Sequence, residues 1–240
     1  MRASAAKVSI HVGALVLSLS LSSAIHACQC SGEYYHDSGI KAIADLTGAK
    51  ASIECRNVKL CNEQASEPYT HSAAYANVNA SGGGWAQCGW LKSNHSAPTV
   101  VRRRYAELQG TNYWIELGSE DPGNGTVNEY KVRLNDLSTG EWYFYVDGGL
   151  WKSRTDSGWI NKKGSSVTYE GEIYRVETDM PGTNADRCSF SGCKYDVNNQ
   201  GTWPDAGLTD ANMHSSDTAK WNYSRISGTA FDIWDVSPLP

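Results

Sequence analysis

The chain has 240 residues, and its 21 Lys and Arg residues against 26 Asp and Glu residues give a formal net charge of −5. Proteins that bind nucleic acid concentrate basic charge on one surface, so this balance argues against a nucleic-acid partner. The basic run Arg102-Arg103-Arg104 lies in a predicted strand and is interpreted as an edge or solvated stretch.

Residues 1–27 have the pattern of a secretory signal peptide. Arg2 and Lys7 precede an apolar run at 8–21, and small residues follow at 22–27. The apolar run is short and rich in serine for a membrane span, and no second long apolar run follows. We therefore predict a secreted, extracellular protein without a membrane span.

All seven cysteines follow this segment, so disulfides are expected in an oxidising compartment. Cys188 and Cys193 are predicted to close a small loop. The odd total leaves at least one thiol over, and the pairing cannot be read from the spacing. Two alternatives stay open for the N-terminal cysteines: a zinc site, although Cys28-x-Cys30 lacks the usual two-residue spacing, and lipidation of Cys28.

Four Asn-x-Ser/Thr sequons predict glycosylation and suit a eukaryotic secretory protein. They begin at Asn79, Asn94, Asn124 and Asn222.

Two segments precede the regular part of the chain. Residues 28–68 are interpreted as a small cysteine-rich segment with a short helix, because Ile40, Ile43 and Leu46 recur at helical spacing. Residues 69–84 are polar and rich in glycine, which predicts a linker or surface loop.

Residues 85–240 have the pattern of a β domain. Trp142, Phe144 and Val146 alternate with Tyr143 and Tyr145, so the two sets face opposite sides of a strand. The predicted strands are, in chain order, 85–92, 100–109, 113–117, 130–134, 141–147, 150–152, 166–178 and 226–236. Short strands at regular spacing predict an all-β, antiparallel sandwich or jelly roll.

The segment Tyr143-Phe144-Tyr145-Val146-Asp147-Gly148, with the polar turn before it, resembles the Phe-Tyr-Val-Asp-Gly hairpin of concanavalin A-like lectins, glucanases and laminin-G modules. The resemblance covers about 25 residues, and it implies a concanavalin A-like jelly roll. Segments at 171–172, 180–182 and 231–234 also resemble pieces of secreted microbial proteins, which implies kinship without a mechanism.

The segment from Gly171 to Glu177 resembles the Glu-x-Asp-x-(x)-Glu strand of retaining β-glucanases. The resemblance implies that Glu172 is the nucleophile and Glu177 the acid/base. Tyr174 stands where that motif has its central Asp.

Strand periodicity points to a different pair. Glu170, Glu172 and Tyr174 should face the same side of a strand, at about 7 Å per two-residue step. Two carboxyl groups on one face bind sugar hydroxyls or hydrolyse a glycosidic bond. The alternative is a solvated sheet face with two ordinary acidic residues.

No pattern in the chain indicates a cofactor or a metal site, and the turn at 121–125 lacks the spacing of a calcium loop. The leading hypothesis is a secreted carbohydrate-binding, lectin-like protein with a site formed by Tyr143, Tyr145, Glu172 and Tyr174. One alternative is a glycan-active hydrolase or lyase that uses Glu170 and Glu172, or Glu172 and Glu177. Another is a secreted structural or effector-like protein without a small ligand.

Overall fold

The structure is a computed structural model, and it describes residues 33–65, 68–96, 99–236 and 238. The predicted signal peptide, Cys28 and Cys30 lie outside these residues. Within them the regular structure is β apart from three short 3-10 helices. None of the helices described is long and apolar enough to cross a membrane.

The strands are, in chain order, β1 (Tyr34–Glu54), β2 (His71–Asn79), β3 (Trp85–Ser93), β4 (Arg102–Gln109), β5 (Tyr113–Leu117), β6 (Val127–Asp136), β7 (Glu141–Val146), β8 (Gly149–Thr155), β9 (Gly164–Tyr174), β10 (Cys188–Val197), β11 (Met213–Ser215), β12 (Trp221–Ser227) and β13 (Ala230–Asp235). The 3-10 helices are η1 (Asn94–Ser96), η2 (Ser157–Trp159) and η3 (Asp210–Asn212).

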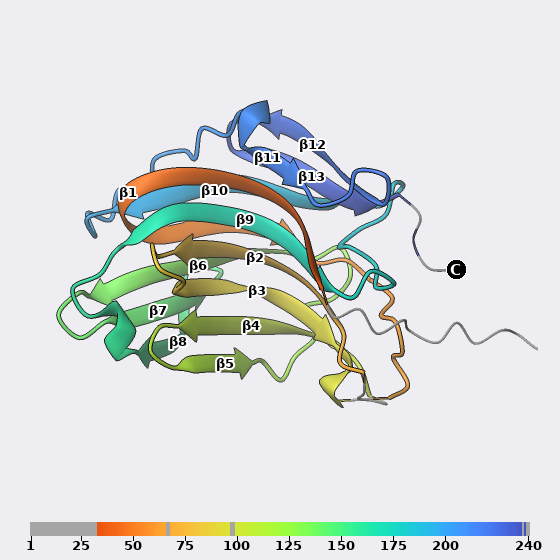
Figure 1. Ribbon diagram of the computed structural model, residues 1–240, viewed down its shortest axis with the longest axis horizontal. Coiled ribbons are helices and arrows are strands. Elements are labelled where there is room, and N and C mark those ends of the chain that lie inside the picture. Colours follow the sequence, from red (N-terminus) through yellow and green to blue (C-terminus); the bar gives the residue numbers. More distant parts are fainter. Residues whose placement is uncertain (1–32, 66–67, 97–98, 237, 239–240) are drawn as a thin grey trace, which may run out of the picture.

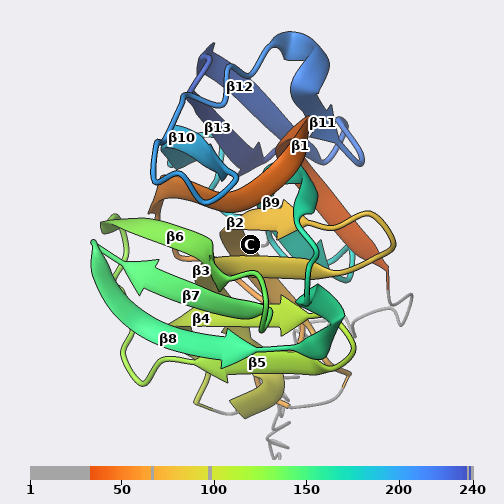
Figure 2. The same ribbon diagram turned by 90° about the vertical axis from the view of Figure 1, so that its left-hand side faces the viewer.

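These strands form two antiparallel layers that share the long strand β1 (Figures 1 and 2). The first half of β1 pairs with β9, and the front sheet continues through β2, β3, β4 and β5. The second half of β1 pairs with β10 and β6, and the back sheet runs β12-β13-β10-β1-β6-β7-β8. The arrangement confirms the predicted all-β sandwich of the jelly-roll type.

The crossing of β1 from one sheet to the other occurs at an irregularity between Ala42 and Leu46, where Asp45 has a φ of 57°. A bulge of this kind bends a strand and lets one strand serve two sheets. The helix expected through Ile40, Ile43 and Leu46 is therefore wrong. The three residues share no inward face in the strand: Ile40 is 40% exposed, whereas Leu46 is fully buried.

The core lies between the two sheets and is rich in aromatic residues. Trp142 and Phe144 of β7 are fully buried, as the alternation predicted. The Trp142 ring meets Trp159 at 4.7 Å between centroids, and Phe144 meets Trp114 of the front sheet at 5.5 Å. Such edge-to-face and tilted pairs stabilise the contact beyond the area they bury.

The segment 69–84, expected to be a linker or surface loop, instead contains β2, a strand inside the front sheet. Its inward positions are small residues, such as Ala74 and Ala76, so β-branched and large apolar residues are nearly absent. A strand paired on both edges needs little intrinsic β propensity, because its neighbours determine its structure.

Gly89 of β3 allows two strands to approach closely. A Cβ at this position would lie 2.0 Å from the carbonyl oxygen of Ala74 in β2. We expect Gly89→Ala to destabilise the fold by about 3 kcal/mol, at the upper end of typical overpacking costs, because backbone atoms cannot move aside cheaply. Thermal unfolding of the purified variant would check this. A melting temperature within a degree of the parent would contradict the pairing of β2 with β3 in this register.

The disulfide predicted between Cys188 and Cys193 is wrong: both thiols are free and buried. The two residues lie on the same strand, β10, and five extended residues span roughly 16 Å. A disulfide needs Cα atoms no more than about 7 Å apart. Burial raises the pKa of the Cys188 thiol, so this residue should react with alkylating reagents only after unfolding.

Candidate functional site

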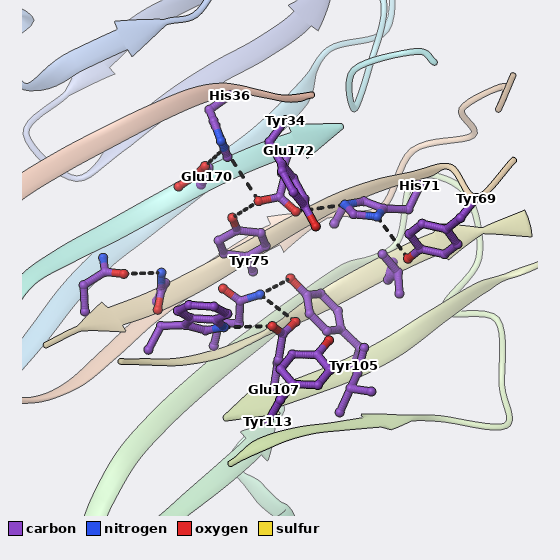
Figure 3. Close-up of a pocket in the computed structure, with 17 residues that line it drawn as sticks. Tyr34, His36, Tyr69, His71, Tyr75, Tyr105, Glu107, Tyr113, Glu170 and Glu172 are labelled. Atoms are coloured by element: carbon purple, nitrogen blue, oxygen red, sulfur yellow. Dashed lines mark hydrogen bonds and ion pairs between the residues drawn. The ribbon is translucent and has the colours of Figure 1, made fainter. Parts of the chain in front are cut away.

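A cleft of about 640 Å³ opens on the face of the front sheet that points away from the core (Figure 3). Its floor is formed by β9, β2, β3 and β4, and β1 and β5 contribute at the sides. Gly89 lies between Tyr75 and Tyr105 in the cross-strand row, so β3 places no side chain there, and the two tyrosine rings lie 6.1 Å apart between centroids. The lining residues are Tyr34, His36, Tyr69, His71, Ala73, Tyr75, Asn77, Asn79, Trp85, Gln87, Leu91, Tyr105, Glu107, Tyr113, Ile115, Glu170 and Glu172.

Strand alternation brings these side chains to one face. In β2 every second residue from His71 to Asn79 lines the cleft, and the residues between them face the core. The same alternation places Glu170 and Glu172 of β9 on the cleft side. Polar and aromatic residues therefore converge on one face, while the opposite face of each strand packs in the sandwich.

Glu172 makes two short hydrogen-bond contacts within the cleft. His71 Nε2 lies 2.8 Å from its Oε1, and the Tyr75 hydroxyl donates to its Oε2 at 2.8 Å. His36 Nδ1 lies 3.6 Å from Oε2. Burial opposes ionisation, but the hydrogen bond and charge of His71, the charge of His36 and the Tyr75 hydroxyl together lower the pKa of Glu172.

Glu170 is 8% exposed, and the pKa of its carboxyl group is raised, whereas that of Glu172 is lowered. Burial raises the pKa of this carboxyl, and the Glu172 charge adds to the effect, while contact with His36 opposes it. His36 pairs directly with Glu170, and the two carboxylates raise the pKa of the imidazole against the effect of its burial. The site therefore holds two neighbouring carboxyl groups that favour different protonation states.

Glu107 of β4 is a third carboxyl group in the cleft. The Trp85 indole donates to its Oε1 at 2.8 Å, and the Gln87 amide donates to its Oε2 at 3.0 Å. Burial, together with the Glu172 charge, raises the pKa of Glu107 to about 7 despite these hydrogen bonds. At acidic pH this carboxyl group is neutral.

Aromatic rings surround the carboxyl groups. Tyr34 and Tyr174 lie 4.8 Å apart between centroids, and Tyr69 and His71 lie 5.5 Å apart. The Tyr69 hydroxyl is 3.0 Å from His71 Nδ1, so it helps to orient the imidazole that contacts Glu172. Tyr34 is 56% exposed and leaves a ring face open to a ligand.

One nitrogen and two carboxylate oxygens, from His36, Glu170 and Glu172, lie within 4.8 Å of one another. Such a donor set suits a divalent cation. His36 Nδ1 already contacts Glu170 directly, and we interpret the group as two neighbouring carboxyl groups beside an imidazole.

The structure separates the residues that were predicted to form one carbohydrate site. Glu172 lines the cleft, and Tyr174 stacks beside it on Tyr34 and His71. Tyr143 and Tyr145 lie on β7 of the back sheet, opposite in direction to the buried Trp142 and Phe144. The two pairs therefore lie on opposite outer faces of the sandwich. The single predicted site was wrong in this respect, because neither the resemblance nor the strand period tells which sheet a strand joins.

Of the two predicted carboxyl pairs, one lies together in the cleft and the other does not. Glu170 and Glu172 lie together in the cleft, as the strand period indicated. Glu177 lies beyond the end of β9, which stops at Tyr174, and it does not line the cleft. The strand expected to continue to Thr178 ends early, because Arg175 adopts a positive φ of 84° and the chain turns.

Sequence reasoning missed His36, His71, Tyr75 and Glu107 as members of the site. The alternation of small and polar residues in His71-Ser72-Ala73-Ala74-Tyr75-Ala76-Asn77-Val78-Asn79 was the available signal. The polar, glycine-rich composition of residues 69–84 predicts a loop instead.

The predicted glycosylation sites differ in accessibility. Asn124 is exposed. Asn94 is fully buried, and its Nδ2 donates to the carbonyl oxygens of Ala65 and Pro68 at 2.7 and 2.9 Å. A glycan on Asn94 is incompatible with this packing. Asn79 lines the cleft, where its Nδ2 donates to Thr168 at 2.9 Å.

Neither protein-family models nor the curated proteins yield a match to this chain. Solved structures do. Scytalido-glutamic peptidase with a peptide-based transition state analog matches with a TM-score of 0.52 and 12% identity over 86% of this chain and 99% of that chain. SCP-B, a member of the eqolisin family of peptidases in complex with the tripeptide Ala-Ile-His, matches with a TM-score of 0.51. Its identity is also 12%, over 86% of this chain and 99% of that chain.

A glycoside hydrolase family 16 endo-glucanase from Bacteroides ovatus also matches, with a TM-score of 0.35 and 8% identity over 59% of this chain and 66% of that chain. At these identities the likeness concerns the fold.

Proposed function

We propose that this protein is a secreted hydrolase that uses Glu172 as general base and Glu170 as general acid, with a peptide bond as its substrate. The observation that carries the proposal is the pair itself. The buried carboxyl group of Glu170 and the partly buried one of Glu172 lie within 4.8 Å of each other in an open cleft, and their pKa values are shifted in opposite directions. Environments that separate the pKa values of two neighbouring acids are typical of acid–base catalysis.

The carboxylate of Glu172 would remove a proton from a water molecule that attacks the scissile carbonyl carbon. His71 and Tyr75 keep that carboxylate oriented and favour its ionised form. Protonated Glu170 would then give its proton to the leaving nitrogen. The pair ends the cycle with the proton on Glu172, and its transfer back to Glu170 restores the starting state. His36, which contacts both groups, is placed to carry that transfer.

Glu107 contributes to binding in this proposal. As a neutral carboxyl group at acidic pH it can donate a hydrogen bond to a carbonyl of the substrate main chain. Gln87 and Trp85 hold it in position. The peptide class is supported by the two structural matches that cover 86% of this chain, which were solved with a peptide-based analog and a tripeptide.

A carbohydrate ligand is the second candidate, and the aromatic lining of the cleft favours it. Tyr34, Tyr69, Tyr113 and Trp85 can stack on the apolar faces of sugar rings, while Glu170 and Glu172 accept hydrogen bonds from hydroxyl groups. In this version the lectin-like site lies in the cleft and excludes Tyr143 and Tyr145.

The experiment is digestion of a denatured protein mixture by the purified protein at pH 3 to 8, with new peptide termini identified by mass spectrometry. A parallel assay measures reducing ends released from a polysaccharide panel and binding to the same panel. New peptide termini that disappear in Glu172→Gln support the peptidase. Sugar binding or release without new termini would replace it with the carbohydrate candidate.

A further inference from the structure

The outer face of the back sheet carries an unusual row of like charges. Lys131 of β6 lies directly opposite Lys50 of β1, and Lys50 lies opposite Lys194 of β10. Like charges at directly opposed positions destabilise a sheet. Tyr145 of β7 continues the row on the other side of Lys131. Repulsion among the three neighbouring lysines lowers the stability of the sheet, so their retention calls for a functional explanation.

Trp203 gives this face a second aromatic ring. Its indole lies against Gly48 of β1, where an added Cβ would come within 2.8 Å of the ring. The loop that carries Trp203 is held to β10 by Tyr195 N–H donating to the Pro204 carbonyl at 3.2 Å and by an ion pair of Lys194 with Asp205 at 3.1 Å. The ring is therefore held in place on the sheet.

Two of the three ammonium groups lie close to these rings, and that of Lys131 lies near both. Lys131 Nζ is 3.8 Å from the Tyr145 ring centroid and 5.9 Å from that of Trp203, and Lys50 Nζ is 5.5 Å from the Trp203 centroid. We call Lys50, Lys131, Lys194, Tyr145 and Trp203 the lysine–aromatic platform.

The charge balance of the platform leaves one cation over. Lys50 pairs with Glu129 at 2.8 Å, and Lys194 pairs with Asp205. Lys131 makes no ion pair with a carboxylate within the described residues. Burial lowers its pKa, and the charges of Lys50 and Arg133 act in the same direction against that of Glu129. An incoming anion would relieve this repulsion.

We propose that the lysine–aromatic platform binds an acidic polysaccharide that carries a carboxylate on its sugar rings. Tyr145 and Trp203 would stack on the apolar faces of successive rings, and Lys131 would pair with a carboxylate between them. A single unpaired ammonium in a chain of net charge −5 suits a polymer with one weakly charged group per ring better than a densely sulfated one. This site lies on the sheet opposite the cleft and does not depend on the proposed function.

The test is titration of the full protein with polygalacturonate by isothermal calorimetry at low and at physiological ionic strength. Fully methyl-esterified polygalacturonate is the neutral probe with the same ring, and dextran sulfate is the sulfated probe. We expect binding to polygalacturonate that weakens with salt, and no binding to the ester.

Lys131→Gln and Tyr145→Ala should each weaken binding about tenfold, from loss of a partly desolvated charge contact or of a stacking surface. Lys220→Gln is the matched control, because Lys220 also lies near an aromatic ring, 5.8 Å from the Trp221 centroid, but outside the platform. It should bind as the parent does. Equal binding by Lys131→Gln and parent, equal binding of the ester, tighter binding of dextran sulfate, or no binding at all would overturn the proposal.

Discussion

Replacing Glu172 by Gln should lower kcat by roughly a thousandfold or more, within the range usual for loss of a general base, and should leave the protein folded. Gln has the shape of Glu and keeps an oxygen that can accept the hydrogen bond from Tyr75 at the same distance. It cannot take a proton from water. The measurement is peptide hydrolysis at pH 4 under saturating substrate, with circular dichroism and thermal unfolding to verify the fold.

Glu177→Gln is the matched control for this experiment. Glu177 carries the same chemical group five residues along the chain, and it lies outside the cleft. Its substitution should leave kcat unchanged. If Glu172→Gln retained most of the parent activity while Glu177→Gln lost it, the general base would have been misassigned.

Activity should depend steeply on pH, and in Glu107→Gln the part of this dependence that comes from KM should disappear. Activity of the parent should require ionised Glu172 and protonated Glu170, so it should be highest in the acidic range and should fall as pH rises through the raised pKa of Glu170. Ionisation of Glu107 near pH 7 places a further negative charge in the cleft. Above that pH we expect KM to rise in the parent.

In Glu107→Gln the rise in KM above pH 7 should be absent, whereas the pH dependence of kcat, which belongs to the Glu170–Glu172 pair, should be retained. A pH profile of kcat that changed while KM did not would make Glu107 part of the proton-transfer machinery instead. Initial rates at pH 3 to 9 over a range of peptide concentrations separate the two outcomes.

Stability gives a readout of the same group without any substrate. The pKa of Glu107 is raised in the folded state, so the folded protein binds more protons than the unfolded chain between the ordinary carboxyl value and about 7. Stability therefore falls as pH rises through this interval. Burial also raises the pKa of Asp37 to about 7, so only the difference between Glu107→Gln and the parent isolates Glu107. The variant should lose less stability between pH 4 and pH 8, as measured by urea unfolding.

Much of the architecture could be predicted from local pattern. The alternation in Trp142-Tyr143-Phe144-Tyr145 determines which side chains enter the core, because successive side chains of a strand point to opposite faces. The same rule places Glu170 and Glu172 on one face of β9, since they are two residues apart. Period-two patterning is a property of the strand itself and needs no knowledge of its neighbours.

Local pattern is therefore enough to predict the all-β class, most strands of residues 85–240 and the shared face of Glu170 and Glu172. It does not predict that β2 lies beside β9, which brings His71 and Tyr75 to Glu172, or that β7 belongs to the other sheet. These features depend on strand pairing, which joins residues far apart in the chain. The pKa values of Glu170 and Glu172 depend on those partners and on burial, and neither is encoded in local spacing.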